Sequence, residues 1–188
     1  EKAITTTLAT KATKPRVMRV LARGDWMDDS GEVVQPGFPS FLPAPQASDR
    51  LLTRLDLARW LTTPDHPLVA RTCMNRLWKM FHGIGLSKTL DDLGSQGDWP
   101  RHLALLDWLA TEFIDSGWDL RHMIRMLVTS RTYRQSSQLR EDLQEIDPYN
   151  QLHARQSIWR IEAEFIRDRA LAISGLLSRE IGGPSVKP

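Results

Sequence analysis

Hydrophobic and polar positions change along the chain from an alternating to a helical spacing. Residues 16–22 alternate well enough to predict one short strand, and Val33 with Val34 predicts a second. Four prolines within residues 36–45 predict an extended segment, because proline cannot join the interior of a sheet. Residues 1–15 are rich in Thr, Ala and Lys, which predicts a linker or a disordered lead-in.

From residue 48 onward, apolar residues recur at intervals of three and four, which predicts a series of helices. We expect the first helix to be capped by Ser48 and to end before Pro64. The second is expected to start at Pro67, a residue well suited to the first turn, and to end at Gly83.

A loop rich in turn-forming residues is predicted for residues 87–100. A third helix is expected over residues 100–116, and Asp119 is expected to cap a fourth. Residues 130–147 are polar and predict no clear element. Apolar positions within residues 151–181 predict one long final helix.

Together these elements predict a mainly α protein, a bundle of four or five helices with a short N-terminal β element and a Pro-rich extended segment. We expect a lead-in over residues 1–15, the strands and the extended segment over 16–47, and a helical domain over 48–188. The chain stops in the turn-rich sequence GGPSVKP, so the helical domain is expected to be truncated at its C-terminus.

The 188 residues include 25 Lys and Arg and 23 Asp and Glu, a formal net charge of +2. This balance argues against a general nucleic-acid binder. No run approaches the about 18 apolar residues of a membrane span. The single cysteine, Cys73, excludes an internal disulfide, a Cys-based zinc site and a CxxCH haem attachment within the chain. Cys73 is expected on the buried face of its helix, as an inert thiol.

Two adjacent loop carboxylates, Asp91 and Asp92, are the first candidates for chemistry. In a loop both can converge on a hard cation or serve as acid and base, with Asp98 and His102 as the nearest further ligands. The alternative, which we favour, is that one of them caps a turn or pairs with an arginine such as Arg76.

A second charged cluster combines the final predicted helix with the 130s segment. Its members are Arg131, Arg134, Arg160, Glu164, Arg167 and Asp168. We interpret the cluster as a buried structural network that links the two segments, with an anion or metal site as the alternative. The five histidines have no HxxxH or HExxH spacing, and no metal site is predicted. Trp26, Trp99 and Trp118 lie in or beside turns and are candidates for an exposed aromatic platform.

An ordered series of motifs from about residue 16 onward makes the chain recognisable. It consists of ARWL (58–61), HPLVAR (66–71), NRLW (75–78), FHGIGL (81–86), TLDDLG (89–94), LLDWLA (105–110), GWD (117–119), SRTYRQSS (130–137), RIEAEFIRD (160–168), SGLL (174–177) and GGPSV (182–186). The series resembles the planctomycete-type domain of unknown function, the PSD-type family whose polypeptides often also carry a planctomycete-type cytochrome c domain.

The resemblance implies a large exported protein of the periplasm or cell envelope, but supplies no accepted activity and no catalytic residues. It implies no cofactor in this chain, and haem c in a neighbouring domain. We therefore expect a non-catalytic helical module that packs against other domains of the polypeptide, a cytochrome c domain among them, and contributes to electron transfer. The alternative is a hydrolytic or redox enzyme acting on an extracellular anionic polymer, with Asp91, Asp92, His102, Arg131 and Arg134 around its cleft.

Overall fold

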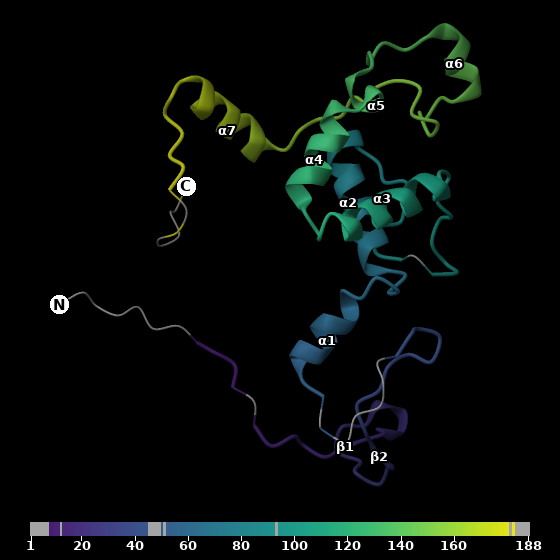
Figure 1. The fold of residues 1–188 in the computed structure, drawn as a ribbon, viewed down its shortest axis with the longest axis vertical. Coiled ribbons are helices and arrows are strands. Elements are labelled where there is room, and N and C mark those ends of the chain that lie inside the picture. Colours follow the sequence, from purple (N-terminus) through teal and green to yellow (C-terminus); the bar gives the residue numbers. More distant parts are fainter. Residues whose placement is uncertain are drawn as a thin grey trace, which may run out of the picture. The chain divides into compact units, whose positions relative to one another are not determined.

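The computed structural model describes residues 8–11, 13–44, 50, 52–92, 94–180 and 182 (Figure 1). These residues are mainly helical with one short two-stranded sheet, which confirms the predicted fold class. The chain divides into two compact units, one ending at Asp65 and the other beginning at His66. The predicted boundary at residue 48 stays a prediction.

The first unit contains the sheet and one helix. Strand β1 (Met18–Arg19) pairs antiparallel with β2 (Val33–Val34), at the positions that the alternating pattern predicts. A 3-10 turn, η1 (Ala22–Gly24), follows β1. Helix α1 (Arg54–Leu61) begins after Thr53, whose backbone and hydroxyl groups both bond to the Asp56 carboxylate. The helix therefore starts later than predicted, and Ser48 lies outside the described residues.

Trp60 is the buried centre of the first unit. Its indole nitrogen donates to the carbonyl oxygen of Pro43 at 2.5 Å, and its ring lies 4.7 Å from that of Phe38. The Pro-rich segment is thus fastened to α1 by an aromatic side chain. Leu55 of the same helix is 57% exposed, and Trp60 is the buried residue of α1.

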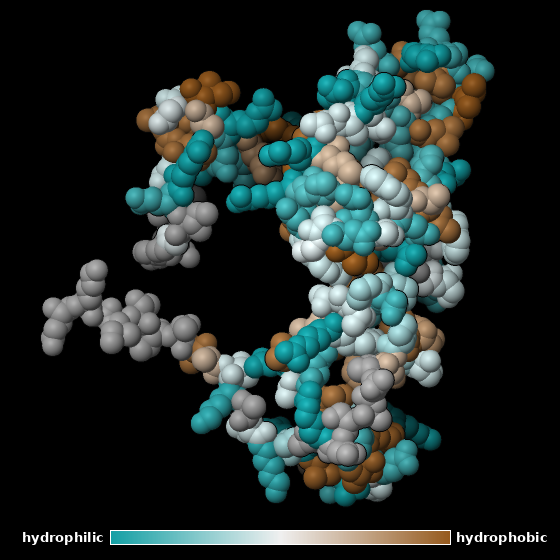
Figure 2. Space-filling model, in the orientation of Figure 1, coloured by the Kyte–Doolittle hydropathy of each residue, from teal (hydrophilic) through white to brown (hydrophobic). Residues whose placement is uncertain are grey.

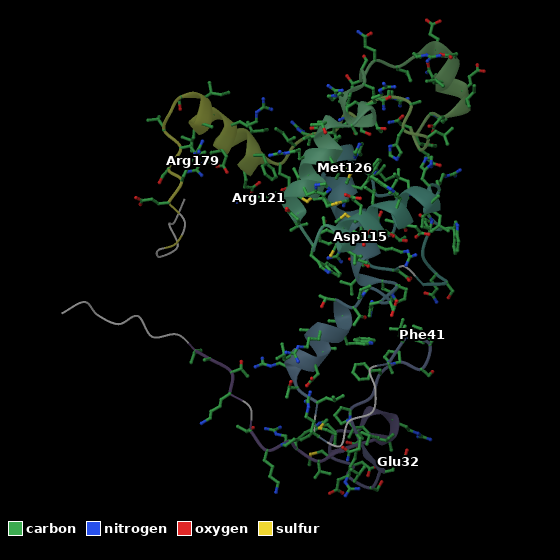
Figure 3. All side chains as sticks on the ribbon, in the orientation of Figure 1. Glu32, Phe41, Asp115, Arg121, Met126 and Arg179 are labelled. Carbon is green, nitrogen blue, oxygen red and sulfur yellow. The ribbon has the colours of Figure 1, made fainter. Side chains whose placement is uncertain are left out.

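The second unit is built on α2 (Val69–His82), α3 (Leu103–Asp115) and α4 (Leu120–Thr129). Its core comprises Ala70, Met74, Leu77, Trp78, Leu86, Leu106, Leu109, Ala110, Phe113, Met123 and Leu127. Met126 of α4 packs against this core and is labelled in Figure 3. Asp119 caps α4 as predicted, since its carboxylate accepts from the backbone of Arg121 and His122.

The prediction that Cys73 is buried is wrong, because the residue is exposed. The buried face of α2 is rotated toward Met74, Asn75 and Trp78, and it includes His82. The apolar spacing predicted a buried face that includes Cys73, whereas the observed face also buries the polar residues Asn75 and His82. Trp118 was likewise expected at the surface, yet it packs edge-on against Phe113, with 5.0 Å between the ring centroids.

The long helix predicted over residues 151–181 is also wrong. Two short helices, α5 (Arg131–Arg134) and α6 (Glu141–Ile146), precede an irregular loop, and α7 covers only Ala163–Ile173. The loop departs from helical geometry at Asn150 and His153, which have φ values of 53° and 54°. No helix in the described part of the chain is long and apolar enough to cross a membrane.

Candidate functional site

A cavity of about 700 Å³ opens in the second unit beside the N-terminal end of α3. Its walls come from residues 84–88, from residues 98–103 and from the later loop that carries Gln151 and His153. Trp99 stands at this cavity with 78% of its surface exposed. We call it the Trp99 cavity.

Asn75 of α2 fastens the first wall. Its amide nitrogen donates to the carbonyl oxygen of Ser87, and its amide oxygen accepts from the Ser87 backbone nitrogen, both at 2.9 Å. The hydroxyl of Ser87 then donates to the carbonyl oxygen of Asp98 at 2.9 Å, which connects the second wall. Gly85 lines this tight passage, and a Cβ there would lie 2.4 Å from the Ser87 carbonyl oxygen. These buried bonds hold the cavity open in one conformation.

Asp147 and Asn150, both buried, shape the loop that forms the third wall. The Asp147 carboxylate accepts from the backbone nitrogens of Gln151 and Leu152 at 2.8 and 2.7 Å. The amide of Asn150 bonds to both backbone groups of Arg155, at 2.7 and 3.2 Å. Such bonds from side chain to backbone compete with helix formation, so the segment forms a compact loop instead.

This loop places His153 among other aromatic rings. The His82 ring stacks on Trp78 with a centroid separation of 3.9 Å, and the His153 ring stands edge-on to Trp78 at 5.1 Å. His102 lies 5.6 Å from His153, and its Nε2 donates to the carbonyl oxygen of Gln151 at 3.1 Å. Three histidines from separate parts of the sequence therefore lie close together, and two of them, His102 and His153, line the Trp99 cavity.

Burial keeps two of these histidines neutral. Burial, together with the neighbouring His82 and His102, lowers the pKa of His153 to about 4, while Asp147 acts in the opposite direction. Burial also lowers the pKa of His82, against a smaller opposing effect of its bond to the Trp78 carbonyl. Near pH 7 His153 is thus an uncharged ring, with one nitrogen that donates and one that accepts.

The loop carboxylates behave as the favoured alternative predicts. Asp91 pairs with Arg76 at 2.8 Å, and Asp91 is 90% exposed. The Asp92 carboxylate accepts from the backbone nitrogen of Gly94 at 2.8 Å, which closes a turn. Of the predicted cleft residues, His102 lines the Trp99 cavity, whereas Asp91 and Asp92 do not.

The second charged cluster is dispersed in the structure. Arg160 precedes α7 and so lies outside the helix that carries Glu164, Arg167 and Asp168. Arg167 lies 3.9 Å from Asp168, and both are exposed. Within the described ranges, no hydrogen bond or ion pair joins these residues to Arg131 or Arg134, which are exposed on α5. The 130s segment bonds instead to the loop before α7, through Gln135 and the His153 carbonyl oxygen at 2.7 Å.

Sequence reasoning singled out His102 and Trp99 but missed the cavity that joins them. Lys88, Arg101 and Gln151 also line it, and the run from Trp99 to His102 just before α3 was the available signal. Among the described residues, no three His, Cys, Asp or Glu side chains are arranged to hold a metal ion.

The fold and the site together define a mainly helical domain with an open, partly polar cavity at Trp99. The family model of PSD1, described as a protein of unknown function (DUF1553), matches residues 53–188, and the chain belongs to this family. This confirms the family expected from the motifs. No curated protein and no solved structure matches the chain.

Proposed function

We propose that the chain is a non-catalytic helical module of a large cell-envelope protein. In this proposal it packs against another domain of the same polypeptide, a c-type cytochrome domain, and positions it for electron transfer. The haem c belongs to that neighbouring domain, since Cys73 alone provides no CxxCH attachment. The periplasmic or cell-envelope location and the cytochrome partner come from the family resemblance.

The observation that carries the proposal is the apolar surface of α7, which is exposed among the described residues. The helix has 11 residues, and isolated helices shorter than about 12–15 residues are marginal in water. Ile166 and Ile173, seven residues apart and on one face, are 52% and 84% exposed, and Phe165 is 58% exposed. Figure 2 shows hydrophobic side chains gathered on α7. A short helix with an open apolar face is typical of a surface that another domain covers.

The state of the loop carboxylates supports a module without catalysis. Asp91 is in an ion pair with Arg76, and Asp92 closes a turn, so neither faces a cavity with a free acid or base. General acid–base chemistry needs such a group within hydrogen-bond reach of a bound substrate. Of the five residues assigned to the cleft in the enzymatic alternative, His102 alone lines the Trp99 cavity, where Asp98 lies as well.

Calorimetric titration of the chain with the cytochrome c domain of the same polypeptide tests the proposal. We expect saturable binding that Ile173→Asp weakens at least about tenfold, equivalent to about 1.4 kcal/mol, because a carboxylate replaces an apolar contact. Met80→Asp is the matched control, since Met80 is also apolar and 68% exposed but lies on α2. Arg134→Glu tests whether charge on α5 contributes to the same interface.

Circular dichroism establishes first that each variant is folded. Absence of a complex with the unmodified chain would contradict the proposal. Equal weakening by Ile173→Asp and Met80→Asp would contradict the assignment of the docking surface to α7.

A further inference from the structure

We propose that the Trp99 cavity binds a saccharide that contains uronic acid, a sugar ring bearing a carboxylate. This goes beyond docking, and no residue of α7 lines the cavity. Its volume of about 700 Å³ falls within the range typical of small-molecule sites. Three features of the walls point to this class of ligand: an exposed indole, side chains that both donate and accept hydrogen bonds, and an excess of positive charge.

The exposed indole is the first feature. Trp99 is 78% exposed, although tryptophan is among the side chains that gain most from burial. Pro100 follows it in the cavity wall and extends the apolar surface. A flat apolar face of this kind matches the C–H face of a pyranose ring, which leaves the sugar hydroxyls directed toward the polar wall.

Imidazole rings in the wall are the second feature. Nε2 of His102 donates to the Gln151 carbonyl oxygen, so its Nδ1 is the ring nitrogen left for a ligand. His153 lines the same cavity, and its neutral ring offers one donor and one acceptor. The Asp98 carboxylate adds acceptors for hydroxyl groups. Mixed donors and acceptors suit hydroxyl groups, which themselves both donate and accept.

The charge of the walls is the third feature. Lys88 and Arg101 line the cavity, and neither forms an ion pair with a described carboxylate, while Asp98 is the one acidic residue of the lining. The walls therefore carry one positive charge in excess. The planar guanidinium of Arg101 is suited to bidentate pairing with a carboxylate.

The cavity is also preformed, which favours binding by a small ligand. The bonds from Asn75 to Ser87 and from Asp147 to the backbone of Gln151 hold two of its walls in place. A ligand therefore meets groups that are already oriented, and less ordering opposes binding.

Titration with trigalacturonate, followed by calorimetry and tryptophan fluorescence, tests the inference. We expect saturable binding that weakens with added salt, because exposed charges are screened. Trp99→Ala and Arg101→Gln are each expected to weaken it about tenfold or more. Trp108→Ala is the matched control, since Trp108 lies on α3, is 52% exposed and does not line the cavity. The methyl ester of the same trisaccharide is expected to bind at least about tenfold more weakly, because it lacks the charge.

Three results would overturn the inference. Absence of saturable binding at millimolar trigalacturonate would exclude the ligand class. Equal binding of the methyl ester would remove the role of the carboxylate. An equal loss in Trp108→Ala would place binding outside the Trp99 cavity. Ile173→Asp is expected to bind trigalacturonate normally, so failure of the docking proposal and failure of this one are distinguishable.

Discussion

Single polar residues in the interior decide the shape of the cavity walls. Asn75 is 1% exposed and bonds to both backbone groups of Ser87, a contact between α2 and the loop after it. Both backbone groups of Ser87 are buried, and a buried polar group without a hydrogen bond is costly. The side-chain amide of Asn75 therefore stabilises the loop by satisfying both groups.

We expect Asn75→Ala to lower the free energy of unfolding by about 2–4 kcal/mol, since it leaves a buried N–H and a buried C=O unsatisfied. Urea unfolding followed by circular dichroism measures the change. Lys79→Ala, at an exposed position on the same helix, serves as the control and is expected to change stability by less than about 0.5 kcal/mol. A similar small effect of both substitutions would show that the Asn75 bonds do not hold the loop.

The buried ring of His153 predicts a dependence of stability on pH. Its pKa is about 4 in the folded chain, below the ordinary value of 6.5, so the unfolded chain takes up the proton first as the pH falls. Stability is therefore highest above pH 6.5 and decreases between there and about pH 4. The groups that act on this ring are His82, His102 and Asp147.

We expect His153→Gln to reduce this loss of stability, measured as the difference in unfolding free energy between pH 7 and about pH 4.5. His122→Gln is the control, because His122 is partly exposed and bonds to Glu112 outside the cavity. An identical pH profile for His153→Gln and the unmodified chain would contradict the assignment of the effect to this ring.

At the scale of elements, several short-range signals predicted the structure correctly, although the start of α1 was wrong, and contacts between distant segments were not predicted. The two strands, the loop before α3 and the cap of α4 at Asp119 all follow from local residue preferences. The predicted final helix failed because Asp147 and Asn150 bond to nearby backbone and produce a loop that apolar spacing does not reveal.

The residues of the Trp99 cavity also divide into those predicted from local sequence and those brought in by distant segments. Trp99 and His102 lie in one short run and were identified, whereas His153 reaches the cavity from a loop 51 residues beyond His102. The bond from Gln135 to the His153 carbonyl oxygen joins segments 18 residues apart, and the spacing of apolar residues does not predict such a contact. The partners of Asp91 and Asp92 could be predicted from short-range considerations. Arg76 lies on the helix just before the loop, and Gly94 lies two residues after Asp92.

The cap of α4 gives a prediction at this scale. Asp119→Ala removes an acceptor for the backbone nitrogens of Arg121 and His122 and is expected to cost about 1 kcal/mol of stability. Asp119→Asn keeps an acceptor oxygen and is expected to retain most of it. Thermal unfolding followed by circular dichroism compares the two. Equal destabilisation by both substitutions would contradict a role of Asp119 as a hydrogen-bonding cap.

For the whole molecule, stability is concentrated in the second unit. The first unit has Trp60 as its one buried residue among those described, whereas the second has a continuous core over α2, α3 and α4. A unit with so small a core buries little apolar surface. Among the described residues, neither the core nor the Trp99 cavity includes a residue of α7, and our proposal assigns this helix to the contact with another domain.

Hydrogen exchange of the α7 amides tests the central claim most directly. In the chain alone we expect Ala163–Ile173 to exchange rapidly, because the helix is exposed, and Leu103–Asp115 to exchange slowly, because α3 faces the core. Saturation with the cytochrome c domain of the same polypeptide is expected to slow exchange in α7 at least about tenfold and to leave α3 unchanged. Unchanged exchange of α7 in the presence of that domain would contradict the account.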